Sequence, residues 1–423
     1  MMYQWHVSLR IGLVWVVLWA LAACVSAPSS DPLGTISEPG VPKQLRSRQI
    51  IVALAEKERP RWSAIAQELR SRYRLRSVGE FLLTSIGVQC LVFQVPPDQS
   101  LEAVLMQLRA DPRIELVQPN QAFEGLQATA YDPMARYAAL AYGVKLIGAD
   151  RAWRISTGRG VSVAVIDTGA DIEHPALRSR EIETENFVEG GESSFASDRH
   201  GTAIAGVINA YVAASAGIEG VAPDATLTVA KACWYADPAN AKARCSSWTL
   251  AKAIDFAIHG GARVINLSLG GRSDELLARL LAAAEQHGVT VVAATLENQE
   301  NPGFPASLDS VIPVMACDSD GQVTWPRWRV TPFVLAAPGV EIVVPAPRNR
   351  YDLVSGSSLA AAHVTGVVAL LLQQRPQLTP KQVKVILQTT AQRLQEPDPA
   401  SLQVGRVDAC AALARQAPQL TCR

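Results

Sequence analysis

The chain has 423 residues, of which 48% are hydrophobic, and it is long enough to form one large core and a smaller second domain. Its 39 Lys and Arg residues balance 39 Asp and Glu residues, so the formal net charge is +0. This balance argues against the strongly basic class of nucleic-acid-binding proteins, and no nucleic acid is expected as a partner.

The N-terminal residues 1–24 differ from the rest in composition. Residues 11–23 are apolar, follow Arg10, and end in Leu-Ala-Ala before Cys24. An apolar stretch this short predicts a signal peptide rather than a membrane span. Leu-Ala-Ala-Cys also resembles the bacterial lipoprotein signal, which implies lipidation of Cys24 and an exported, membrane-anchored protein in the periplasm or at the cell surface. A secretory signal with an incidental cysteine is the alternative.

Residues 25–47 are rich in Ser, Pro and Gly and predict a flexible tether. The pattern changes over residues 48–126, where strands are expected at residues 49–54, 89–95 and 114–119, and helices at residues 61–73 and 101–110. This order predicts a small α+β, ferredoxin-like domain with its helices on one face of the sheet.

From residue 144 onward, apolar strands alternate with helical patterns. Strands are expected at residues 161–166, 226–230, 264–267, 289–293 and 311–315, and helices at residues 248–259 and 275–287. Such alternation predicts an α/β fold with a doubly wound, mainly parallel sheet. Residues 359–372 are apolar enough to suggest a membrane span, but His363 interrupts them and favours a buried core helix.

Three short motifs in this region carry groups with catalytic potential. The strand at residues 161–166 ends on Asp167, His200 opens a helix of small residues, and Ser358 lies in a Gly-Ser-Ser turn before an apolar helix. A hydroxyl at a helix N-terminus meets free N–H groups that stabilise a developing negative charge. Asp167 alone is also typical of a turn cap, and His200 alone of an exposed histidine. Their occurrence in the order Asp, His, Ser favours a catalytic triad.

Together, over residues 131–394, these motifs resemble the subtilase family of serine proteases, peptidase family S8. The resemblance implies a serine endopeptidase with Ser358 as nucleophile, His200 as general base and Asp167 orienting the imidazole. His363, on the helix that carries Ser358, resembles a structural histidine of the motif. The expected partners are therefore peptide or protein substrates.

In front of such a domain, residues 48–126 resemble the family's inhibitory prodomain, whose C-terminal tail occupies the substrate cleft. We therefore expect a catalytic domain at residues 127–417 and a short tail at residues 418–423. The small residues 127–130 are suited to lie extended in the cleft as the first substrate. Self-processing would then give a mature chain that begins between Phe123 and Tyr137.

The sequence Val-Ile-Asn-Leu-Ser-Leu-Gly resembles the family strand that pairs with substrate, which implies contacts from Ser268, Leu269 and Gly270. The oxyanion segment departs from the family pattern Ala-Ala-Gly-Asn. Counted without gaps, Glu297 stands where the family has its Asn donor, and Asn298 follows one residue later. Either Asn298 donates from a shifted position, or the chain is a catalytically impaired scaffold that binds peptides or partners.

The resemblance implies no cofactor. Many subtilases bind calcium in the loop after the His helix, but residues 210–217 offer no carboxylate or amide ligand, so no metal site is predicted. Cys90 and Cys317 lie in apolar, strand-like segments and are expected to be buried and free. Two local pairs are expected as disulfides in an oxidising compartment: Cys233–Cys245 and Cys410–Cys422.

Overall fold

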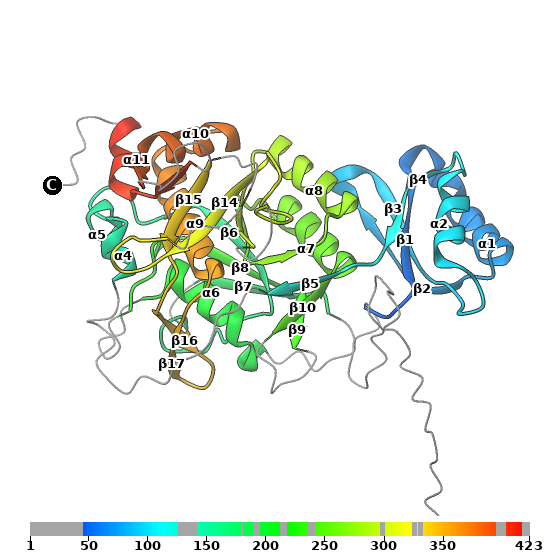
Figure 1. The fold of residues 1–423 in the computed structure, drawn as a ribbon, viewed down its shortest axis with the longest axis horizontal. Coiled ribbons are helices and arrows are strands. Elements are labelled where there is room, and N and C mark those ends of the chain that lie inside the picture. The colour runs from blue at the N-terminus through cyan, green and yellow to red at the C-terminus, as the bar shows by residue number, and fades with distance from the viewer. Residues whose placement is uncertain are drawn as a thin grey trace, which may run out of the picture.

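A small N-terminal unit and a larger α/β unit follow each other along the chain (Figure 1). The structure is a computed structural model that describes residues 45–125, 142–178, 181–188, 195–211, 218–235, 242–296, 301–323, 328, 333–394 and 403–416. The predicted signal peptide, Cys24 and most of the predicted tether lie outside these residues, and so does the predicted C-terminal tail.

The N-terminal unit (residues 45–119) is an antiparallel four-stranded sheet in the order β2-β3-β1-β4, with two α-helices. Its elements are β1 (Gln49–Ala55), η1 (Glu56–Arg61), α1 (Trp62–Arg72), β2 (Arg76–Leu83), η2 (Thr84–Ile86), β3 (Val88–Gln94), α2 (Leu101–Arg109) and β4 (Ile114–Pro119). Strand β2 is absent from the sequence prediction, because Gly79 and charged residues interrupt its apolar pattern.

The sheet of the N-terminal unit has two apolar faces, because side chains alternate along each strand. On one face, Ile50 and Val52 of β1 pack under α1 and α2. On the other, Ile51 and Ala53 belong to one hydrophobic cluster with Trp248 of the α/β unit. The unit covers the first face with its own helices and needs the α/β unit to cover the second.

The α/β unit is built on a nine-stranded sheet in the order β18-β19-β15-β14-β13-β11-β6-β8-β7. All neighbouring strands are parallel except β18 and β19. This arrangement confirms the predicted α/β class with a mainly parallel sheet. The strands are β6 (Ser162–Asp167), β7 (Ile182–Asn186), β8 (Thr226–Lys231), β11 (Val264–Leu267), β13 (Thr290–Ala294), β14 (Val311–Cys317), β15 (Val334–Pro338), β18 (Gln392–Arg393) and β19 (Val404–Arg406).

Helices cover both faces of this sheet (Figure 1). Helices α6 (Arg199–Asn209) and α9 (Ser357–Gln374) pack together in one hydrophobic cluster, and α7 (Ser247–His259) and α8 (Glu275–Gln286) in the other. The other α-helices in the described part of the unit are α4 (Gly143–Leu146), α5 (Ala149–Ala152), α10 (Pro380–Thr390) and α11 (Ala409–Gln416). Among the described residues, α9 is the one helix long and apolar enough to cross a membrane. Because 89% of it is buried inside the protein, it is a core helix, as predicted.

Two smaller sheets complete the α/β unit. The strands β16 (Ile342–Ala346) and β17 (Arg350–Val354) form a hairpin. The other sheet has the order β12-β5-β10-β9 and contains β12 (Leu269–Gly271), β5 (Ala122–Gly125), β10 (Ala243–Ser246) and β9 (Cys233–Tyr235). Strand β5 directly follows the N-terminal unit, so the chain enters the α/β unit as the second strand of this sheet.

The cysteine predictions are largely confirmed. The disulfide Cys233–Cys245 joins β9 to β10, and Cys90 and Cys317 are buried and free. Cys410 is also disulfide-bonded, while Cys422, its predicted partner, lies outside the described residues.

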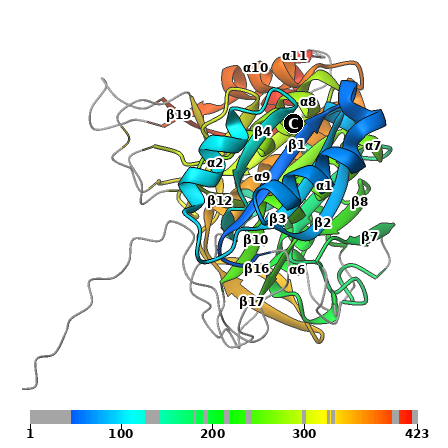
Figure 2. The same ribbon diagram turned by 90° about the vertical axis from the view of Figure 1, so that its right-hand side faces the viewer.

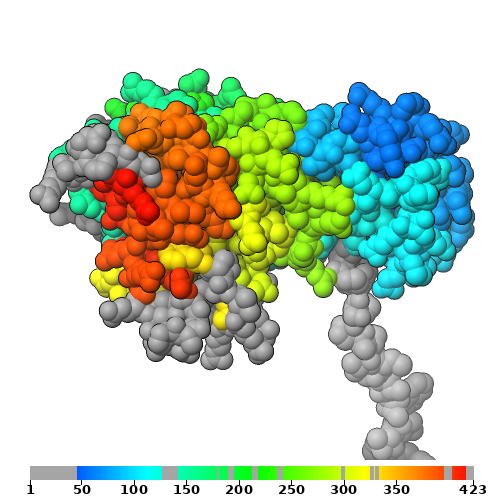
Figure 3. Space-filling view, turned by 90° about the horizontal axis from the view of Figure 1, so that it is seen from above, coloured from blue at the N-terminus to red at the C-terminus, as the bar shows by residue number. Residues whose placement is uncertain are grey.

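The N-terminal unit lies against α7 and α8 at one end of the molecule (Figures 2 and 3). The backbone N–H groups of Thr84 and Ser85 donate to the Asp255 carboxylate at 3.3 and 2.8 Å. Phe81 stacks on Trp248 with ring centroids 6.0 Å apart. This contact therefore combines a buried aromatic pair with charge-assisted hydrogen bonds.

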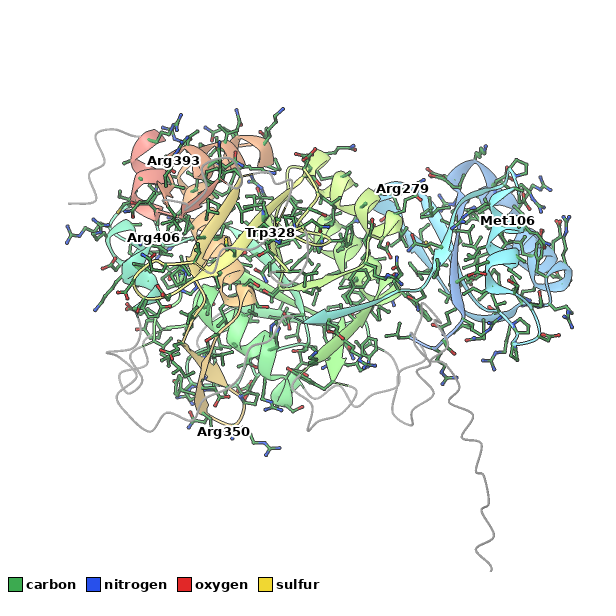
Figure 4. All side chains as sticks on the ribbon, viewed as in Figure 1. Met106, Arg279, Trp328, Arg350, Arg393 and Arg406 are labelled. Carbon is green, nitrogen blue, oxygen red and sulfur yellow. A yellow bond between two sulfur atoms is a disulfide. The ribbon has the colours of Figure 1, made fainter. Side chains whose placement is uncertain are left out.

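A second set of polar contacts lies at the start of α8. Gln118 donates to the carboxylate of Asp274, the N-cap residue of α8, at 2.7 Å. Arg279, labelled at the junction of the two units in Figure 4, pairs with Glu115 at 3.0 Å. The docked orientation is thus fixed at both ends of the N-terminal unit's sheet.

Candidate active site

Asp167 and His200 are in direct contact at the carboxyl end of the large sheet. Strand β6 ends at Asp167, and His200 is the second residue of α6. The Nδ1 of His200 lies 2.8 and 2.9 Å from the two carboxylate oxygens of Asp167, and both residues are buried. A carboxylate at Nδ1 holds the proton on that nitrogen, so Nε2 is the nitrogen that can accept a proton from a nucleophile.

The turn after Asp167 fits closely against α6. The N–H of Thr168 donates to the Asp167 carboxylate at 2.7 Å, and the N–H of Gly201 donates to the Thr168 hydroxyl at 3.1 Å. A Cβ at Gly201 would lie 2.0 Å from the carbonyl oxygen of Gly169, so a larger residue cannot fit there. The glycine after His200 therefore allows the acid and base segments to approach each other.

Tyr235 is a neighbour of His200 that sequence analysis missed. Its hydroxyl accepts the backbone N–H of His200 at 2.9 Å. Burial raises the pKa of this phenol, so it stays neutral at physiological pH. Tyr235 lies on β9, next to the Cys233–Cys245 disulfide, and no local sequence pattern relates it to His200.

Ser358 is the second residue of α9 and is buried. Its hydroxyl donates to the carbonyl of Ser268 at 3.2 Å, and the Ser268 hydroxyl donates to the carbonyl of Ser358 at 3.0 Å. These bonds hold the start of α9 against the beginning of β12. Helices α6 and α9 pack against each other. His200 and Ser358 are each the second residue of their helix, so both lie at the N-terminus of one of two adjacent helices.

His363 has a structural role on the same helix. Its Nδ1 lies 2.8 Å from the carbonyl oxygen of Leu359, to which it donates. Burial lowers the pKa of His363 to about 4, so the ring is neutral at physiological pH. The side chain is committed to the helix backbone, which agrees with the prediction that it is not the catalytic base.

Two of the predicted substrate-binding residues lie on a strand that already pairs with another segment of this chain. Leu269 and Gly270 lie on β12, in antiparallel register with Gly125 and Glu124 of β5. On its other side, β5 pairs antiparallel with β10. An extended peptide between two strands is the arrangement by which a substrate backbone adds to a sheet. The segment described in this position is Ala122–Gly125, whereas the predicted residues 127–130 lie outside the described residues.

Phe123 anchors β5 in this position. Its side chain is fully buried, and its ring lies 6.1 Å from that of Phe304 in a tilted arrangement. It also fills the space in which Gly271 would place a Cβ. On the opposite face of β12, the Leu296 side chain lies over Gly270. Phe123 therefore occupies a closed apolar site beside the strand pair.

The oxyanion segment is described up to Leu296. The carbonyl of Thr295 accepts a hydrogen bond from the Ser357 hydroxyl at 2.9 Å, so the end of β13 lies beside the start of α9. Glu297 and Asn298 themselves lie outside the described residues, and the prediction for Asn298 is not tested.

A family model described as "Subtilase family" matches residues 158–405, which include Asp167, His200 and Ser358. The chain belongs to the subtilase family. It is 35% identical over 286 residues to the "Thermophilic serine proteinase" of Bacillus sp. (strain AK1), covering 67% of this chain and 69% of that protein. It is 33% identical to "Subtilisin DY" of Bacillus licheniformis, covering 60% and 92% of the two chains. This subtilase is therefore a serine endopeptidase.

A solved structure supports the fold of this subtilase. The crystal structure of fervidolysin from Fervidobacterium pennivorans superposes with a TM-score of 0.68 at 24% identity. The superposition covers 86% of this chain and 60% of the fervidolysin chain. Subtilases need no cofactor for catalysis, although many bind calcium. Within the described residues, no group of three or more His, Cys, Asp or Glu side chains could hold a metal ion, and most of the predicted calcium-loop position lies outside them.

Proposed function

We propose that this subtilase is an exported endopeptidase whose catalytic triad is Asp167, His200 and Ser358, and that it cuts its own chain after the N-terminal unit. The observation that carries the proposal is the 2.8 Å contact between His200 Nδ1 and the Asp167 carboxylate, with Ser358 at the start of the adjacent helix. A base oriented by a buried carboxylate is what a serine hydroxyl needs to become nucleophilic.

The proposed reaction proceeds through an acyl-enzyme. His200 Nε2 takes the proton of Ser358 Oγ as the oxygen bonds to the scissile carbonyl carbon, and Asp167 stabilises the imidazolium. His200 then gives this proton to the leaving amine as the C–N bond breaks. Water then attacks the ester carbonyl as His200 takes its proton, and His200 returns that proton to Ser358 Oγ as the ester C–O bond breaks and the new carboxyl end leaves. Backbone N–H groups at the start of α9 favour the oxyanion at both steps.

The N-terminal unit is proposed as an inhibitory prodomain. Its support is β5, which pairs with β10 and β12 in antiparallel register and buries Phe123 completely. Gly125 is opposite Leu269, and the residue before Leu269 is Ser268, whose carbonyl holds the Ser358 hydroxyl. Continuing the register by one residue favours Leu126–Gln127 as the first bond cut. This bond lies within the range predicted from sequence, Phe123 to Tyr137.

A serine-directed phosphonate probe tests the proposed nucleophile. We expect the probe to label Ser358 in the processed wild-type protein, and labelling to disappear in His200→Ala because the hydroxyl is then unactivated. Peptide mapping locates the modified residue. A folded, processed protein that takes up no probe would instead favour the catalytically impaired scaffold.

Asn298 is proposed as the side-chain donor to the oxyanion. Asn298→Ala is expected to lower kcat about 10²- to 10³-fold with little change in KM, since the donor acts mainly on the charge that develops in the transition state. Steady-state peptide hydrolysis measures both constants. Gln299→Ala, which removes the neighbouring amide, is the matched control and is expected to retain activity. An unchanged kcat in Asn298→Ala would exclude this residue as the donor.

Cys24 is proposed as the lipid anchor of an exported protein. Cys24→Ser removes the thiol that receives the lipid, so the variant is expected to leave the membrane fraction or to stay unprocessed. Membrane fractionation of producing cells measures its distribution, with Ser26→Ala as a control that keeps the thiol. Equal membrane attachment of Cys24→Ser and wild type would support an ordinary secretory signal.

A further inference from the structure

A buried ion pair lies beside the Asp167–His200 contact. Lys231, the last residue of β8, is 7% exposed and donates to the carboxylate of Asp198, which is 3% exposed. The same ammonium donates to the carbonyl oxygen of Thr168 at 2.6 Å and lies 5.7 Å from the centre of the Phe195 ring. Burial of both charges requires that each be compensated by the other.

The ion pair connects the segments that present the acid and the base. Thr168 directly follows Asp167, and its N–H donates to the Asp167 carboxylate. Asp198 is the N-cap residue of α6, two positions before His200, and its carbonyl accepts from the Thr202 hydroxyl. Lys231 therefore ties the turn after β6 to the start of α6, and it does so from a third element, β8.

The pair also controls the charge near the imidazole. Asp167 from β6 and Tyr235 from β9 interact electrostatically with Asp198, and Arg199 and His200 directly follow it on α6. Tyr235 is neutral. When Asp198 is ionised it cancels the Lys231 charge, so the Asp167 carboxylate is left to stabilise the imidazolium. When Asp198 is neutral, an unbalanced ammonium remains beside the base and opposes its protonation.

We propose that Asp198 and Lys231 are positioning residues for the catalytic base. Lys231 holds the Asp167 turn against the start of α6, and Asp198 balances the lysine charge so that the His200 imidazolium can form. The inference rests on the proposed triad. It assigns a role to two residues outside that triad.

The pKa of Asp198 lies in the pH range in which a histidine base gains or loses its proton. Burial raises the pKa of the Asp198 carboxyl to about 7, although Lys231 acts in the opposite direction. As the pH falls through this range, Asp198 becomes neutral and the charge of Lys231 is no longer balanced. The His200 imidazole is then harder to protonate. Binding of a proton by Asp198 therefore disfavours binding of a proton by His200, and the reverse also holds.

The effect is tested by the isosteric change Asp198→Asn, which keeps an oxygen acceptor for Lys231 but fixes the group as neutral. The low-pH fall of kcat/KM, its acid limb, is expected to move to lower pH by up to about one unit, because only the wild type has, above a pH of about 7, an ionised Asp198 that balances the ammonium. The double variant Asp198→Asn/Lys231→Met removes both charges and is expected to return the limb to the wild-type position. A purely structural role would lower kcat or stability in these variants and leave the midpoint of the limb unchanged.

A readout independent of activity separates this inference from the proposed function. In a Ser358→Ala background, NMR titration of the His200 ring is expected to show the same downward shift in Asp198→Asn and its reversal in the double variant. Asp198→Ala, which removes the carboxylate without adding an amide, serves if the Asn variant does not fold. Asp224→Asn, which removes the acid of the exposed Arg159–Asp224 pair, is the control with an unchanged titration. Agreement of the His200 midpoints of wild type and Asp198→Asn within about 0.2 pH unit would overturn the inference.

Discussion

Ser358→Ala is expected to remain a single chain after signal removal, whereas the wild type yields a catalytic fragment that begins between Phe123 and Tyr137. Loss of the nucleophile of a serine triad lowers kcat by about six orders of magnitude. A tethered segment is present at millimolar effective concentration, so even a slow wild-type enzyme completes the cut. N-terminal sequencing of the two purified proteins measures the difference.

Ser357→Ala is the matched control for this experiment. Ser357 is the adjacent hydroxyl and donates to the Thr295 carbonyl, so its loss removes one structural hydrogen bond and leaves the proposed nucleophile in place. We expect it to be processed, with a loss of about 1 kcal/mol in stability. Equal processing of Ser358→Ala and wild type would mean that another protease makes the cut.

Phe123→Ala is expected to release the N-terminal unit once the chain has been cut. The ring is fully buried against Phe304 and the Gly271 backbone, and truncation of a buried Phe costs about 3–5 kcal/mol. The affinity of the cut unit for the α/β unit is thereby lowered roughly 10²- to 10⁴-fold. Size-exclusion chromatography of the processed protein measures retention of the unit, and peptide hydrolysis per mole of protein is expected to rise as it leaves.

Met106→Ala is the control for this change. Met106 is 66% exposed on α2 and lies on the side of the N-terminal unit away from the α/β unit (Figure 4). Its truncation is expected to leave the unit bound. If Phe123→Ala also keeps the unit bound, the anchor is not Phe123, and the contacts on α7 and α8 suffice to hold it.

The elements that sequence analysis located correctly are those whose pattern is local. Strand β11 was predicted over Val264–Leu267 because a continuous apolar run is typical of a strand buried on both faces. Helix α8 spans Glu275–Gln286, within one residue of the predicted range of 275–287, because its apolar residues recur at helical spacing. In such segments the residues adjacent in sequence are sufficient to determine the conformation.

Strands β5 and β10 were not predicted, because each is short and exists through pairing with a distant segment. Arg244 of β10 pairs with Glu124 of β5, and neither strand has an apolar period of its own beyond a few residues. The same limit applied to the active site. Asp167, His200 and Ser358 stand in recognisable motifs, whereas Lys231 and Asp198 meet only in the fold, and a lysine at the end of a strand is ordinarily a solvated residue.

The uncovered second face of the N-terminal unit's sheet has a consequence for reversibility. Once the unit leaves, Ile51, Ala53 and Cys90 face water, and we expect so small a domain to unfold when one of its two apolar faces is exposed. Departure is then effectively one-way. Burial raises the pKa of the Cys90 thiol and shields it while the unit is docked, and Cys317 stays buried within the α/β unit throughout. The fraction of Cys90 that is alkylated, with Cys317 unmodified, would therefore measure the fraction of molecules that have lost their N-terminal unit.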